Sequence, residues 1–323
     1  MALTAEILAI TRQGWVKDEQ DASKTIAPTY GYFVPKAEKI NSGGPPDIVI
    51  RYADTGVDNP SEFGTHDVAH YETRTSLTTN DVAHYHTPVS VSHLEAMKTQ
   101  GNKHSRGKML TIKRRDAAKS GVKQINADMV NGIANTSFPA SPRIIGFRNA
   151  ISTNAYFNLT ASLAWFTPQA DAITTIASLS IVSAISAQIT LILQNEGNPT
   201  AGICSGSVWD KLEQEHAGRE RVIVGSKGIT SAYFGAETIV VRNCMIWQDP
   251  ACNAATPFDL FILTPDAIQV DFYSTTGELW HDTGERVPVN SEVTTLNMHA
   301  YPLMRIGNMR QMSHFTSGTT GMT

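Results

Sequence analysis

Histidines are the residues of this chain best placed to do chemistry, because six of the ten lie within residues 66–104. An imidazole nitrogen binds zinc and related metals, and it also takes up a proton near about pH 6.5. Two similar runs hold four of them, HDVAHYETR at 66–74 and NDVAHYHTP at 80–88. Three interpretations follow: a metal site that includes Asp67 or Asp81, a pH-sensitive contact, or surface histidines with no special role. The pH-sensitive interpretation concerns His66, His70, His84 and His86.

Neither the histidines nor the cysteines follow a known catalytic pattern. HDVAH at 66–70 differs from the HExxH of zinc proteases, and no cysteine is near it. Gly202–Gly206 places Cys204 between glycines, as at a nucleophile elbow, but the nearest base, His216, lies on the next expected helix. We therefore expect Cys204 to be a small buried residue, and the chain to be no enzyme and to need no cofactor. A metal-dependent hydrolase using the histidine cluster at 66–104 is the alternative from a different class.

The main charge feature is a basic stretch at 98–123, with nine lysines and arginines against one acid, Asp116. The whole chain has a net charge of −4, so this stretch is a local exception. Such a surface either faces a polyanion such as DNA or forms salt bridges with a neighbouring subunit, and both interpretations stay open. The side chains concerned on the expected helix are Lys108, Lys113, Arg114, Arg115, Lys119 and Lys123.

Composition is that of a soluble globular protein with a substantial core. The 323 residues are 41% hydrophobic and 17% charged. Three cysteines, an odd number spaced far apart, argue against a disulfide framework and fit a reducing compartment. Ile173–Leu193 has no charge and is long enough to span a bilayer, but eight serine, threonine and glutamine side chains interrupt it. We expect a buried helix there and no membrane contact.

Two segments have no core of their own. Residues 21–47 are rich in proline and glycine and are expected to form an extended arm. The two histidine-containing runs flank a polar turn and predict a β-hairpin, which is marginal without a neighbour. The natural neighbour for both segments is another subunit. The arm aromatics expected at such contacts are Trp15, Tyr30, Tyr32 and Phe33.

The remainder predicts a mixture of helices and strands. Apolar and small residues at three- and four-residue steps predict a long helix over 108–133, ending near Asn131-Gly132. Residues 149–208 carry only two charges and predict a core. Short strands are expected at 201–205, 221–224, 238–241, 260–263 and 267–272, followed by a β-rich tail at 287–312.

In this order of elements the chain resembles the tailed-bacteriophage major capsid proteins of the Hong Kong 97-like family. Three local sequences are similar to those of that family: Trp165 with Pro168 before the first core helix, YFGAETIV at 233–240 and FDLFIL at 258–263. The resemblance implies an α+β, Hong Kong 97-like capsid fold. Its five parts would be an N-terminal arm at 1–47, an E-loop hairpin at 48–97, a peripheral domain with a spine helix at 98–171, an axial domain at 172–265, and return strands to the peripheral domain with a C-terminal tail at 266–323.

The resemblance implies a structural function, self-assembly as pentamers and hexamers into an icosahedral shell around double-stranded DNA. The implied location is the virion, with assembly in the host cytoplasm. The implied partners are non-specifically bound DNA, a portal protein and an optional decoration protein. About fifty residues precede the hairpin, so we expect a separate scaffolding protein. Residues 51–97 contain no lysine, so we expect no lysine cross-link between subunits. An encapsulin-like nanocompartment shell is the alternative within this fold.

Overall fold

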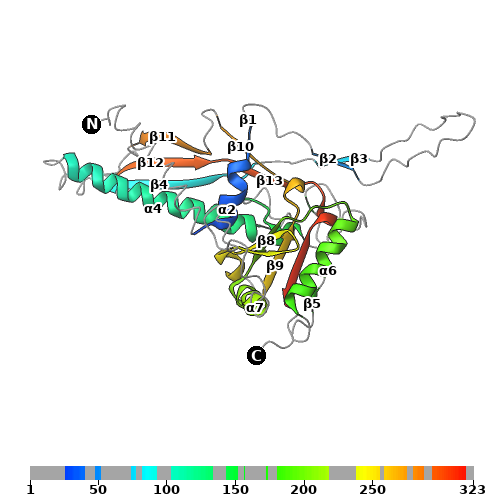
Figure 1. The fold of residues 1–323 in the computed structure, drawn as a ribbon. Helices are drawn as coiled ribbons and strands as arrows, with labels where there is room; N and C mark the ends of the chain where they lie inside the picture. The colour runs from blue at the N-terminus through cyan, green and yellow to red at the C-terminus, as the bar shows by residue number, and fades with distance from the viewer. Residues whose placement is uncertain are drawn as a thin grey trace, which may run out of the picture.

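The computed structural model shows a long helix lying along a sheet, with a second lobe of strands and helices at one end of that helix (Figure 1). The described residues are 26–40, 48–51, 74–77, 82–92, 103–133, 143–151, 156, 172–173, 180–217, 238–254, 258–274, 279–286 and 293–317.

The first layer is a three-stranded antiparallel sheet packed on one face by the long helix α4 (Lys103–Val130). The strands, in order, are β11 (Trp280–Arg286), β12 (Val293–Ala300) and β4 (Tyr85–Ser92). Burial in β4 has a period of two, because Tyr85, Val89 and Val91 are buried while His86 is exposed. Alternate side chains of a strand point to opposite faces, so one face of this sheet packs on α4 and the other points away from it.

Two glycines fix how α4 meets its surroundings. A Cβ atom placed on Gly121 would lie 2.6 Å from the Trp280 ring, so only glycine lets the helix approach the sheet this closely. The helix ends near Asn131-Gly132, as the sequence predicts, and Gly132 has a φ of 47°. Glycine adopts this left-handed conformation readily, which is why it terminates helices.

The other lobe is built on a six-stranded mixed sheet, and a smaller three-stranded sheet lies beside the first layer. The six strands, in order, are β5 (Ala172–Ile173), β14 (Ser313–Ser317), β9 (Asp259–Leu263), β6 (Ala201–Cys204), β8 (Cys244–Gln248) and β7 (Thr238–Val241). The smaller sheet has the order β1 (Glu38–Ile40), β10 (Ile268–Tyr273) and β13 (Pro302–Ile306). Short helical turns are α5 (Phe147–Ala150), η4 (Pro250–Ala254), η5 (Pro265–Ala267) and η6 (Met309–Gln311).

Two helices pack on the six-stranded sheet, α6 (Ile181–Gln194) and α7 (Gly206–Ala217). Helix α6 confirms part of the expected buried helix, since Ile185 and Ile192 are fully buried. The Glu215 carboxylate of α7 accepts the Ile181 backbone N–H of α6 at 2.8 Å. A negative charge there also complements the helix dipole. Among the described helices, none combines the length and the apolar character needed to cross a membrane.

The described part of the arm is not extended throughout. Residues Pro28–Phe33 form the helix α2, followed by the 3-10 turn η1 (Val34–Lys36). Pro28 stands at the start of α2, where its fixed φ suits a helix and its missing N–H is not needed. The proline and glycine content of 21–47 predicted an extended arm, but residues 28–36 of that segment are helical.

Among the described residues the hairpin pairs 48–51 with 74–77, and residues 66–73 of the near-repeat lie outside them. Strand β2 (Ile48–Arg51) pairs antiparallel with β3 (Arg74–Leu77). The second run of the near-repeat, at 80–88, instead leads into β4, which pairs with β12 over eight residue pairs. A buried face against α4 is available to β4 in this position. That long-range packing outweighs the local similarity of the two runs.

Replacing Gly121 with alanine tests the close approach of α4 to Trp280. Alanine has the higher helix propensity, by about 1 kcal/mol, yet we expect G121A to lower the free energy of unfolding by about 1 kcal/mol. Overpacking against a buried indole costs about 1–3 kcal/mol. Urea unfolding measures the change, with exposed Ser120→Ala as the control. A G121A protein at least as stable as S120A would contradict the packing described.

Candidate functional site: buried charges that join the layers

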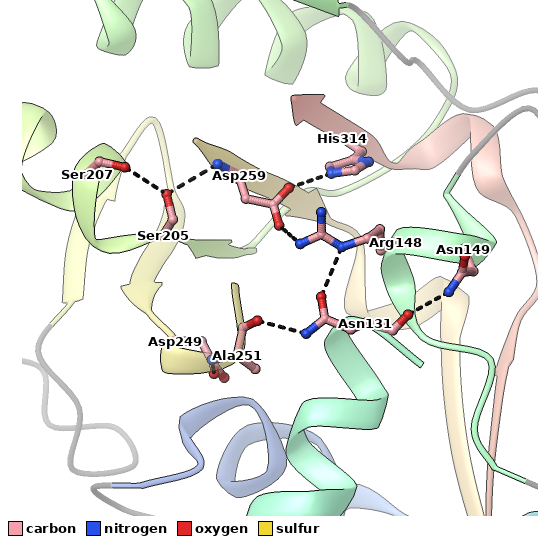
Figure 2. Close-up of polar contacts among 9 residues, drawn as sticks. All are labelled: Asn131, Arg148, Asn149, Ser205, Ser207, Asp249, Ala251, Asp259 and His314. Carbon is pink, nitrogen blue, oxygen red and sulfur yellow. Dashed lines mark hydrogen bonds and ion pairs between the residues drawn. The ribbon is translucent and has the colours of Figure 1, made fainter. Parts of the chain in front are cut away.

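The centre of the site is Asp259, a fully buried carboxylate at the start of β9 (Figure 2). It forms an ion pair with Arg148 of α5, and His314 Nε2 of β14 lies 2.7 Å from its other oxygen. The backbone of Asp259 is held too, because its N–H donates to Ser205 Oγ at 3.2 Å. Three segments that are far apart in sequence therefore meet at one carboxylate.

Arg148 connects this carboxylate to the end of the long helix. Its Nε donates to Asn131 Oδ1 at 2.9 Å, just beyond the last residue of α4. The Asn131 amide in turn donates to the Ala251 carbonyl at 2.8 Å, in η4. Asn149 donates to the Asn131 backbone carbonyl at 2.6 Å (Figure 2). The end of α4 is thus hydrogen-bonded to both α5 and the six-stranded lobe.

A second buried carboxylate, Asp249, joins α2 to the same region. It accepts the Thr29 backbone N–H at 3.2 Å, the Asn126 amide at 2.9 Å and the Ala251 backbone N–H at 2.8 Å. Asn126 of α4 also accepts the Tyr30 backbone N–H at 2.8 Å. Burial raises the pKa of Asp249, and these hydrogen bonds partly offset that rise by favouring the ionised form.

A third carboxylate, Asp128, ties α4 to the three-stranded sheet. The Tyr85 hydroxyl of β4 donates to it at 2.6 Å, and Arg143 Nε donates to it at 2.8 Å. The Ile144 backbone N–H donates to the Tyr85 oxygen at 3.2 Å. Burial, and then the Asp128 charge, raise the pKa of Tyr85 well above its usual value. The phenol therefore stays protonated and remains a donor.

A fourth buried pair, Asp271 of β10 with Arg305 of β13, crosslinks the smaller sheet. Both side chains are excluded from solvent. A buried carboxylate needs hydrogen-bond donors in place of water, and all four have them. Asp259, Asp128 and Asp271 are also ion-paired, whereas Asp249 accepts from neutral groups. The arrangement is suited to fixing layers relative to one another. None of the four buried carboxylates was predicted from the sequence, although a lone acid inside an apolar run, as in Phe258-Asp259-Leu260, is a usable signal of a paired buried charge.

The predicted basic residues do not share one surface. Arg114 is buried. Lys113 is directed toward the sheet, where its ammonium group donates to the Ser90 carbonyl of β4 at 2.8 Å. Arg115 and Lys123 are exposed, and Lys119 between them is half-buried. Lys108 lies in α4, but its side chain is outside the described residues. The basic stretch is therefore divided between the sheet side and the outer side of the helix.

The predicted arm aromatics pack inside their own subunit. Tyr30, Tyr32 and Phe33 are nearly excluded from solvent. The Tyr32 ring centroid lies 4.9 Å from that of Trp247, and the Phe33 centroid lies 5.6 Å from that of Phe147. The expectation that these three make intersubunit contacts is corrected: the helix α2 turns them into the core. Trp15 lies outside the described residues.

Two of the four predicted histidines are placed, and they meet partners that the sequence analysis did not name. His84 Nε2 lies 2.9 Å from His299 Nδ1, and the His86 and His299 ring centroids are 4.9 Å apart. His66 and His70 lie outside the described residues. Within the described ranges, no three histidine, cysteine, aspartate or glutamate side chains are grouped as a metal site requires.

Cys204 is fully buried, as expected. Its thiol lies 3.5 Å from the Trp247 carbonyl, and burial raises its pKa. A thiol that stays protonated and has no access to solvent is a poor nucleophile. Burial also raises the pKa of Cys244, to about 12, and that of Cys252.

Breaking the Arg148–Asp259 pair should weaken the junction between α5 and β9. We expect Arg148→Leu to lower the free energy of unfolding by about 3 kcal/mol, because it leaves a buried carboxylate short of a donor. The double variant R148L/D259L should recover part of that loss. Urea unfolding of the purified chain measures both, with Arg115→Ala, on the exposed face of α4, as the matched control. Equal stability of R148L and R115A would refute the role given to this pair.

No protein-family model matches this chain, and no curated protein matches its sequence. Solved structures, in contrast, match nearly all of it. The chain is similar to the capsid asymmetric unit of cyanophage A-1(L), with 12% identity and a TM-score of 0.66 over 91% of this chain and 93% of that chain.

Two further matches have the same character. One is a structure from Mycobacterium phage Ogopogo, with 13% identity and a TM-score of 0.53 over 87% of this chain and 89% of that chain. The other is an encapsulin from Synechococcus elongatus, with 10% identity and a TM-score of 0.52 over 93% of this chain and 91% of that chain. At such identities the likeness concerns the fold. This chain has the mixed helix-and-sheet, Hong Kong 97-like fold of the phage capsid proteins.

Proposed function

We propose that this chain is a major capsid protein of a tailed bacteriophage. It would self-assemble as pentamers and hexamers into an icosahedral shell around double-stranded DNA, and it would have no enzymatic activity. The observation that carries the proposal is the likeness to a cyanophage capsid chain over about nine-tenths of both chains. The five parts expected from the sequence, from the arm at 1–47 to the tail at 266–323, belong to the same proposal.

The β2–β3 pair supports assembly on physical grounds. Among the described strands, these two pair only with each other, and they lie apart from the rest of the molecule (Figure 1). An isolated two-stranded hairpin is marginally stable in water. Contact with a neighbouring subunit would supply a surface that the other described strands do not offer to this hairpin.

The outer side of α4 supports a contact with DNA. Arg115, Lys119 and Lys123 follow one another at four-residue intervals, so they form a row on the helix with a rise of about 6 Å between members. Asp116 is exposed beside the row and reduces its net charge. Lys113 is directed to the sheet and is therefore not part of this surface. The proposed contact is with phosphates and independent of base sequence.

Other partners are proposed from the family resemblance. They are a separate scaffolding protein, a portal protein and an optional decoration protein, with assembly in the host cytoplasm and residence in the virion. An encapsulin-like shell is the second candidate, because the Synechococcus elongatus encapsulin also matches over about nine-tenths of this chain. The enclosed material distinguishes the two: DNA for a capsid, a protein for an encapsulin.

Electron microscopy of the purified chain, with sizing chromatography, tests the assembly. We expect closed shells, or rings of five or six subunits, when the chain is produced with its scaffolding protein. Correctly closed shells from the chain alone would overturn the proposal of a separate scaffold but would support the capsid function. A stable monomer or dimer under both conditions would overturn the capsid function itself.

Removing the charges of the α4 row tests the DNA contact. The triple variant R115Q/K119Q/K123Q should bind duplex DNA more weakly and lower the slope of log affinity against log salt by up to about 3, since each phosphate contact contributes about 0.9. Fluorescence anisotropy at several salt concentrations measures this slope. A matched triple variant at described cations on other elements, K36Q/K39Q/K211Q, is the control. Equal slopes for both variants would show that the α4 row does not contact DNA.

A further inference from the structure

Four histidines gather on the face of the three-stranded sheet that points away from α4. Strand pairing sets His281 of β11 opposite His299 of β12, and His299 opposite His86 of β4. His84 lies two residues before His86 and therefore on the same side. Its ring stacks on those of His299 and Tyr301, with centroids 5.2 and 5.0 Å apart. The near-repeat in the sequence contains only His84 and His86 of this group, since His281 lies in β11 and His299 in β12.

The closest contact in this group lies where the chain leaves the hairpin. Leu77 ends β3, and His84 follows it by seven residues. The residues on either side of His84 are also held. The Ala83 N–H donates to the Pro302 carbonyl at 3.2 Å, and the Tyr85 hydroxyl donates to Asp128. Within residues 82–92, the His84–His299 contact therefore lies at the end of the segment nearest β3 and beside the Ala83–Pro302 hydrogen bond.

The chemistry of this contact depends on protons. At 2.9 Å, one ring nitrogen donates and the other accepts, so at least one of the two rings must be neutral. With both rings protonated there is no acceptor, and two positive charges face each other. Histidine is the side-chain type whose charge ordinarily changes between about pH 5 and pH 8, so pH is the variable that acts on this contact.

Several described titratable and charged groups near the pair have hydrogen-bond or ion-pair partners of their own. His281 Nε2 lies 2.9 Å from the Tyr273 carbonyl, and its ring is beside that of Tyr301. On the opposite face of the sheet, Asp128 is paired with Arg143 beneath Tyr85. Further along β4, the Lys113 ammonium group of α4 donates a hydrogen bond to the Ser90 carbonyl.

We propose that His84 and His299 form a proton-controlled latch at the base of the β2–β3 hairpin. The latch is closed while one ring is neutral, and it opens when both rings are charged. Opening releases the start of β4 from β12 and frees the point from which the hairpin leaves the sheet. The proposal concerns a single chain and does not depend on the capsid function.

Hydrogen–deuterium exchange of the purified chain tests the latch. The peptide that contains the Ala83 amide is followed at pH 7.5, 6.0 and 5.0, with rates corrected for intrinsic chemical exchange. In the unaltered chain we expect protection to fall about tenfold between pH 7.5 and 5.0, because a hydrogen bond is lost and two like charges meet. Protection that does not change with pH in the unaltered chain would overturn the proposal.

Two variants and a control make the test specific. His84→Phe keeps a ring against Tyr301 but cannot be charged, and His299→Gln offers an amide oxygen that accepts from His84 at every pH. Both should keep their protection at pH 5.0, so failure of one to fold leaves the other to decide. His281→Gln, which changes a neighbour outside the pair, should lose protection as the unaltered chain does. If the first two variants lose protection to the same extent as that control, the latch is excluded.

Discussion

A carboxylate inside a protein is stable only when hydrogen-bond donors replace the water that it has lost. Asp259 takes its two charged or chargeable partners from α5 and β14, and its backbone is held by Ser205. The partners come from residues as far apart in sequence as Arg148 and His314. The position of the long helix depends on this site as well, because Arg148 is also hydrogen-bonded to Asn131 at the end of α4.

Buried carboxylates recur at two further junctions between layers and once within a single sheet of the described structure. Asp249 joins α2 to α4, Asp128 joins α4 to β4, and Asp271 joins β10 to β13. Apolar side chains provide most of the stabilisation of such a core, but contacts between them are not directional. A buried carboxylate with three donors is satisfied in one arrangement only. The charges therefore determine how the apolar layers are aligned, which a shell subunit needs if its contact surfaces are to match those of its neighbours.

Local features of the fold could be predicted from the sequence, and long-range pairings could not. The end of α4 at Asn131-Gly132 and the burial of Cys204 depend on neighbouring residues or on polarity, and both predictions are confirmed. The near-repeat at 80–88 gave no sign that this run continues into β4, which packs on α4 and pairs with β12, some two hundred residues later. The prediction that the arm aromatics contact another subunit was wrong for a related reason, because Pro28 starts a helix that turns Tyr30, Tyr32 and Phe33 into the core. His299 could not be linked to His84 without the register of β12.

The strand order of the six-stranded sheet has a consequence for the timing of folding. Strand β14 lies between β5 and β9, although it is the last described strand in the chain. Until the ribosome has released residue 317, the outer edge of β9 has no strand beside it and Asp259 lacks His314. An open edge of this kind can pair with other chains. The lobe that carries β9 therefore stays incomplete in a nascent chain until β14 has been synthesised and can pair with it.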